Sequence, residues 1–166
     1  MKTLVVYSTL TGNTKMIAES IAEAVPGCDL KAVEDTPAAD AYDVVFPGFW
    51  VDKGHADDKM LAYMETIKGK KVAPFFTLGA WPDSEHADHV FEDTKGRLEG
   101  NEILGHYRCQ GKVDPKLLER MKQMTNNPHP SSPEREARIK EAAKHPDADD
   151  CAKAKTFAKT IMGGVN

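Results

Sequence analysis

Short apolar runs recur along the first 110 residues of the chain, and each spans four to eight residues. Several are unbroken stretches of valine, phenylalanine or leucine, which is typical of strands that are covered on both faces. Their length and their glycine or polar boundaries favour strands over helices. We therefore predict five strands, at residues 2–7, 29–33, 43–46, 71–77 and 103–110.

Helical periodicity fills most of the intervals between these runs. Met16, Ile17 and Ile21 recur at the spacing that places side chains on one face of a helix, and Pro26 and Gly27 then end the pattern. Similar stop signals follow two of the later periodic stretches. We predict helices at residues 13–25, 56–68, 84–98, 115–125, 133–144 and 148–162.

The alternation of strands and helices predicts an α/β fold in which helices cover both faces of one parallel sheet. Five strands within about 110 residues favour a three-layer, doubly wound sheet with strand order 2-1-3-4-5. In such sheets the ligand crevice lies at the carboxyl ends of the strands, where the strand order reverses. The loop after the first strand is therefore the first place to look for a ligand.

A proline-rich segment interrupts the alternation before the last helix. Residues 126–147 carry four of the ten prolines and too few apolar residues for a core of their own. We interpret this segment as a helical insertion within a single domain that spans residues 1–166. Its Glu and Arg residues suit a solvated helix face, and the alternative is an element that docks a partner or a second copy.

Charge and composition narrow the functional classes. The formal net charge of −4 disfavours nucleic acid or an anionic membrane surface as the main partner. No run of 18 apolar residues predicts a membrane span, and the first residues lack the pattern of a secretion signal. Three cysteines without close spacing suit a reducing compartment, so we expect a cytoplasmic protein.

The junction of the first strand and the first helix is unusually rich in small polar residues. Anions bind at helix N-termini because unpaired N–H groups point outward there and the helix dipole is positive. Hydroxyl and amide groups can add donors, and a glycine lets the backbone approach closely. The predicted phosphate-binding residues are Ser8, Thr9, Leu10, Thr11, Gly12, Asn13 and Thr14.

The sequence of this loop argues against other classes of phosphate site, and a purely structural role is the remaining alternative. It lacks the Gly-Lys-Ser/Thr sequence of a triphosphate site and the GxGxxG pattern of a dinucleotide fold. An ordinary helix start, capped by one Ser, Thr or Asn side chain, is the simplest alternative. No histidine or cysteine spacing indicates a metal site, and no Ser–His–Asp arrangement indicates a catalytic residue, so neither is assigned.

The hexapeptide at residues 9–14 reads Thr9-Leu10-Thr11-Gly12-Asn13-Thr14 and matches the pattern T-x-T-G-N-T. In this pattern and at this position the chain resembles the flavodoxin family, whose phosphate loop binds flavin mononucleotide (FMN). The resemblance covers residues 1–112 and the last helix. It implies a flavodoxin-like fold, FMN as the cofactor and transfer of single electrons.

The resemblance also implies that the loops after the third and fourth strands hold the flavin ring. The only two tryptophans, Trp50 and Trp81, fall one in each of these loops, where their rings could stack on the flavin. Carboxylates there, such as Asp52 and Asp83, would disfavour a negative charge on the reduced ring. The predicted contacts are Pro47, Gly48, Phe49, Trp50, Val51, Asp52, Lys53, Gly54, Leu78, Gly79, Ala80, Trp81 and Asp83.

Three functions are compatible with this sequence. The resemblance implies an electron carrier that exchanges low-potential electrons with a redox partner, either a flavin or an iron–sulfur reductase, and a monomer is favoured. The alternative is an FMN-dependent NAD(P)H:quinone-type oxidoreductase, which shares the fold and the flavin and is usually a dimer. A flavin-free interaction module that kept the scaffold is the third.

Overall fold

The computed structural model describes residues 1–124 and 131–165 of the chain. Its strands are β1 (Thr3–Tyr7), β2 (Asp29–Ala32), β3 (Val44–Asp52), β4 (His55–Ala56), β5 (Lys71–Val72), β6 (Phe75–Leu78), β7 (Glu102–Ile103) and β8 (Tyr107–Gln110). Its α-helices are α1 (Asn13–Ala24), α2 (Asp58–Met64), α3 (Glu85–Arg97), α4 (Pro115–Gln123), α5 (Pro133–Ala142) and α6 (Ala148–Val165). Two short 3₁₀ helices, Val33–Asp35 and Ala39–Ala41, link β2 to β3.

The sheet has five parallel positions, and their order confirms the predicted arrangement 2-1-3-4-5. β1 pairs with β2 on one side and with β3 on the other. β5 and β6 together form the fourth position beside β3, while β7 and β8 form the fifth. Pro74 lies between β5 and β6 and has no N–H group to donate, which interrupts the ladder there.

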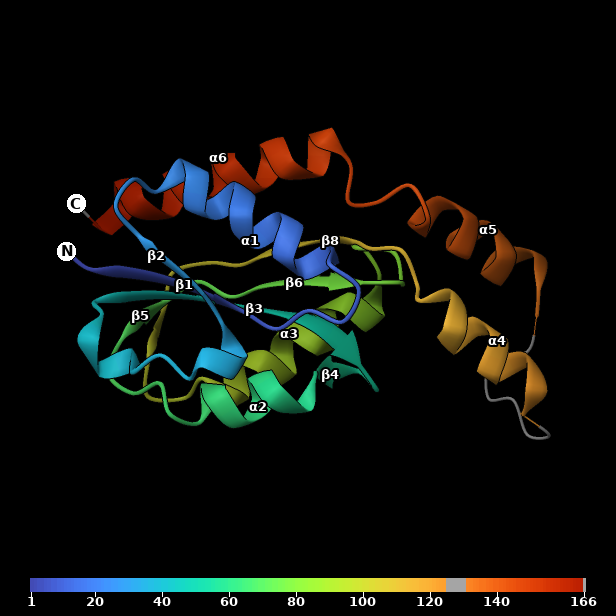
Figure 1. Cartoon of the computed structure of the whole chain (residues 1–166), viewed down its shortest axis with the longest axis horizontal. Coiled ribbons are helices and arrows are strands. Elements are labelled where there is room, and N and C mark those ends of the chain that lie inside the picture. The colour runs from blue at the N-terminus through green and yellow to red at the C-terminus, as the bar shows by residue number, and fades with distance from the viewer. Residues whose placement is uncertain (125–130, 166) are drawn as a thin grey trace.

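Helices cover both faces of the sheet and give three layers (Figure 1). On one face α1 and α6 lie side by side and pack against alternate strand residues such as Val5 and Phe46. On the other face α2 and α3 pack against Leu4, Val45 and Phe76. Successive side chains of β1 therefore pack into the cores on opposite faces of the sheet, as the two-residue period of a strand requires.

The third strand is longer than predicted. The sequence predicts a loop at residues 47–54 after a strand that ends at residue 46, but β3 runs to Asp52. It then turns back through Lys53 and Gly54, both in the left-handed region, and pairs with β4. Two consecutive left-handed residues are the signature of a two-residue hairpin turn, and a lysine at the first position conceals that signal in the sequence.

Two helices, α4 and α5, extend beyond the carboxyl ends of the strands rather than covering a face (Figure 1). α4 has no buried residue, and in α5 only Ala142 is buried. The predicted helical insertion corresponds to α5, while residues 126–130 of the prediction lie outside the described residues. No helix in the described part of the chain is long and apolar enough to cross a membrane.

Candidate functional site

The first helix begins without a side-chain cap, although the loop before it is rich in capping residues. Its N-cap position is Gly12, which has a left-handed backbone and no capping side chain, and the first turn carries no acidic residue. The hydroxyl of Thr9 instead accepts from the N–H of Gly12 at 3.0 Å. The interpretation of this loop as an ordinary capped helix start is therefore wrong. Among the described residues no side chain caps the first turn, so its N–H groups can serve an anion.

Three polar side chains of residues 8–14 hold this loop in place. Ser8 donates to the carboxylate of Asp57 at 2.6 Å, and the hydroxyls of Thr14 and Thr77 are 2.9 Å apart. The amide of Asn13 donates to the backbone oxygen of Lys112 at 2.9 Å. These contacts fix the loop to α2, β6 and the segment after β8, and they use donors that were predicted to bind a phosphate.

The loop forms one wall of a cleft of about 500 Å³ at the carboxyl ends of the strands. We call it the loop cleft. Volumes of about 300–1,000 Å³ are usual for small-molecule sites. It is lined by Thr9, Leu10, Thr11, Asn13, Thr14, Trp50, Val51, Asp52, Lys53, Thr77, Leu78, Gly79, Gly111, Lys112, Val113, Asp114, Leu117, Met121 and Met124. Eleven of these belong to the predicted site, so the structure brings together three segments that are distant in sequence.

The opposite wall of the loop cleft comes from α4, which is absent from the predicted site. Leu117 and Met121 face the cleft from this helix, and Met124 follows at its end. Their three- and four-residue spacing in an otherwise polar helix is the signal that could have found them. Leu117 is 39% exposed and Met124 is 53% exposed, so this apolar wall has no cover from the described residues.

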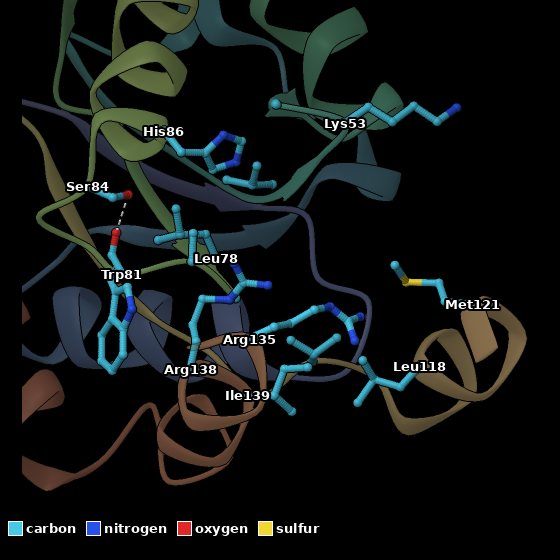
Figure 2. Close-up of a pocket in the computed structure, with 15 residues that line it drawn as sticks. Lys53, Leu78, Trp81, Ser84, His86, Leu118, Met121, Arg135, Arg138 and Ile139 are labelled. Carbon is cyan, nitrogen blue, oxygen red and sulfur yellow. Dashed lines mark hydrogen bonds between the residues drawn. The ribbon is translucent and has the colours of Figure 1, made fainter. Parts of the chain in front are cut away.

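The two tryptophans do not meet at the loop cleft. Trp50 is half-buried near the end of β3 and lines it, whereas Trp81 is 42% exposed and lines a neighbouring cavity. Figure 2 shows the indole of Trp81 pointing away from Lys53 and His86. Gly54 and Ala80 also line only the neighbouring cavity. The expected pair of rings is therefore divided between two adjoining spaces.

Several predicted contacts lie in the sheet instead of in a loop. Pro47, Gly48 and Phe49 are buried in β3, and the Phe49 ring stacks on Phe76 with 5.2 Å between centroids. A Cβ atom on Gly48 would lie 2.0 Å from the ring of Phe75, so packing requires a glycine there. Their predicted position in a loop is corrected, because β3 continues through them, and none of the three lines the loop cleft.

Three further predicted residues do not line the loop cleft. Ser8 is buried behind the first loop and Gly12 is the N-cap of α1, and neither lines the loop cleft. Asp83 lines neither cavity. The cap of α3 is Ser84, whose hydroxyl accepts from the N–H of Ala87 at 3.2 Å.

Asp57 is a buried carboxylate directly behind the first loop. One carboxylate oxygen accepts from Ser8 and from the N–H of Met60, while the other is buried without a partner among the described residues. Desolvation raises the pKa of Asp57 above its ordinary value, although these hydrogen bonds oppose the shift. The group therefore links the stability of the loop to pH.

Asp57→Asn should remove the free-energy cost of burying an ionised carboxylate, a cost that grows as pH rises. A folded-state pKa above the unfolded value means that folding favours the protonated form. The favourable contribution of this group is complete below the unfolded pKa of about 3.9 and is lost as pH rises through the folded pKa. Relative to the wild type, the variant should therefore gain free energy of unfolding as pH rises from about 4 towards 7.

Urea unfolding at several pH values measures this difference. Asp58→Asn, an exposed carboxyl in the same helical turn, is the matched control. A difference that shrinks with rising pH, or one that Asp58→Asn reproduces, would contradict the role of burial at Asp57.

Known proteins share this architecture. The family described as "Flavodoxin domain" matches residues 4–159. The flavodoxin-like domain-containing protein BilS of Clostridioides difficile (strain CD3) is 36% identical over 174 residues, which cover 98% of this chain and 97% of that protein.

Two solved structures are similar in fold. Oxidised flavodoxin 2 from Bacillus cereus has a TM-score of 0.62 and 20% identity, and the match covers 99% of both chains. A flavoprotein from Lactobacillus acidophilus NCFM, solved in complex with FMN, has a TM-score of 0.52 and 19% identity over 72% of this chain and 97% of that one.

Proposed function

This chain belongs to the flavodoxin family, and from that premise we propose that it binds FMN in the loop cleft and exchanges electrons with a partner reductase. One observation carries the proposal. The uncapped N-terminus of α1 and the Thr11 side chain adjoin a cleft whose far wall is an exposed apolar helix face. FMN carries an anionic phosphate at one end and a flat aromatic ring at the other. The helix N-terminus suits the phosphate, and the apolar wall suits the face of the ring.

The residues present fit this cofactor. The free N–H groups of the first turn of α1 would bind the phosphate, helped by the hydroxyls of Thr9 and Thr11. Val113, Leu117 and Met121 would exclude water from the ring. When bound, the flavin supplies the redox chemistry.

Charge in the loop cleft is nearly balanced, since Asp52 and Asp114 are matched by Lys53 and Lys112. The described residues of this cleft therefore give little net attraction to a second charged molecule. A carrier needs an exposed surface for transient docking, and Met124, which is 53% exposed among the described residues, provides apolar surface beside the cleft. The enzymatic alternative is favoured by a different observation, the second cavity that adjoins the cleft beside Val51 and Leu78.

Purification and anaerobic reduction test the proposal. We expect a yellow protein that releases FMN on denaturation. NADPH alone should leave its absorbance unchanged, and addition of a flavin or iron–sulfur reductase should bleach it. Rapid bleaching by NADPH without a reductase would support the oxidoreductase alternative. A colourless protein that fails to take up FMN would overturn the proposal.

A further inference from the structure

A second cavity of about 540 Å³ adjoins the loop cleft and shares part of its lining, including Val51, Leu78 and Met121. We call it the arginine cavity. It is bounded by the end of β6, the turn before α3, and the facing sides of α4 and α5 (Figure 2). Helix α5 thus supplies one wall of a space beside the proposed flavin.

The ionisable residues of the arginine cavity are all basic. Arg135 and Arg138 come from α5, Lys53 from the β3–β4 turn and His86 from α3, and the lining residues that the structure describes include no Asp or Glu. This is unexpected in a chain with a formal net charge of −4. The rest of the lining is largely apolar, as at Leu78, Leu118 and Ile139.

The two arginines face the same cavity. They are three residues apart on α5, so they share one face of the helix. Figure 2 shows the guanidinium of Arg138 directed towards Leu78 and that of Arg135 directed towards Leu118. Within residues 1–124 and 131–165, neither forms an ion pair with a carboxylate.

Burial makes this arrangement costly without a ligand. The Nε atom of Arg135 is buried and has no hydrogen-bond partner among the described residues. Burial and, secondarily, the nearby Arg135 lower the pKa of Arg138, although an arginine stays charged at neutral pH. Partly desolvated cations that lack partners are costly, and a bound anion would remove that cost.

The C-terminal end of α5 is anchored beside the segment that follows β8. Ala142, at the end of α5, is fully buried. The N–H of Lys112, just after β8, donates to the backbone oxygen of His145 at 3.0 Å. These contacts hold the helix that carries the two arginines against the cavity. Side chains on a fixed element are expected at a ligand site.

We propose that the arginine cavity binds a small organic carboxylate with an apolar body, with its carboxylate on Arg135 and Arg138. Planar guanidinium groups bind carboxylates through paired hydrogen bonds, and the apolar lining would cover the rest of the molecule. That the ligand lies next to a flavin rests on the proposed function, whereas binding itself does not.

Calorimetric titration of the purified, flavin-loaded protein with 1-naphthylacetate and with neutral 1-naphthylacetamide tests the site. The two probes share an apolar body and differ in charge. Because hydrogen bonds between charged groups are stronger than those to a neutral amide, the acid should bind at least about tenfold more tightly than the amide. Equal affinities of the wild type for the two probes would overturn the proposal.

The double variant Arg135→Gln, Arg138→Gln should lose about tenfold or more in affinity for the acid and much less for the amide. Lys140→Gln is the matched control, because it removes a positive charge from an exposed position of α5 that lines neither cavity. Circular dichroism verifies that the variants are folded.

Two further outcomes would overturn the proposal. In one, Lys140→Gln weakens binding of the acid as much as the double variant does. In the other, the double variant shifts the flavin's midpoint potential while leaving the affinity for the acid unchanged, which would assign the arginines to the flavin itself. A protein without flavin, seen from its absorbance, would contradict the proposed function but not the anion site.

Discussion

Thr11→Asp is expected to lower the affinity for FMN by at least about 100-fold while the protein stays folded. Thr11 lines the loop cleft beside the uncapped start of α1. A carboxylate about 4 Å from a phosphate costs about 4 kcal/mol per pair of unit charges at an effective dielectric constant of about 20. The same carboxylate would interact favourably with the positive end of the α1 dipole. The flavin-free protein should therefore lose no stability.

Fluorescence titration of the flavin-free protein with FMN measures this affinity, and urea unfolding measures the stability. Thr156→Asp is the control, because it adds the same charge at an exposed position of α6 that lines neither cavity. Unchanged affinity in the Thr11 variant would place the phosphate elsewhere. A parallel loss of stability would attribute the effect to folding instead of binding.

Phe49→Ala should destabilise the flavin-free protein by about 3–5 kcal/mol. Its side chain is fully buried and stacks on Phe76 with an interplanar angle of 13°. Removing it leaves a cavity at the point where β3 carries Trp50 to the loop cleft. A loss of that size is a large part of the roughly 5–15 kcal/mol that keeps a typical domain folded.

Chemical unfolding followed by circular dichroism tests this expectation. Leu10→Ala is a suitable comparison, since Leu10 is also a predicted flavin contact but is 56% exposed. It should change the free energy of unfolding by less than about 0.5 kcal/mol. If Phe49→Ala had an equally small effect, the assignment of Phe49 to the core would be wrong, and the original prediction of a flavin contact would stand.

The order of the sheet and most helices follow from local patterns. The unbroken apolar run Leu4-Val5-Val6 marks a strand covered on both faces, and the helical spacing of Ile17 and Ile21 marks the face of α1 that packs on it. The place of residues 8–14 can be predicted in the same way, because the loop between the first strand and the first helix must lie at the carboxyl end of β1 in such a sheet. The hairpin at Lys53 is not evident from the sequence, because its turn lacks the usual Asn-Gly or Asp-Gly pair.

Periodicity and chain order are enough to define the doubly wound fold and the place of the polar loop after β1, because both act between residues that are close in the chain. Which side chains share a cavity depends instead on packing in three dimensions. That packing places Leu117 and Met121 across the loop cleft from the first loop and separates Trp81 from Trp50. It also directs the side chains of Arg135 and Arg138 towards a cavity beside β6. The segments that meet there are far apart in the chain, and no local pattern encodes contacts between them.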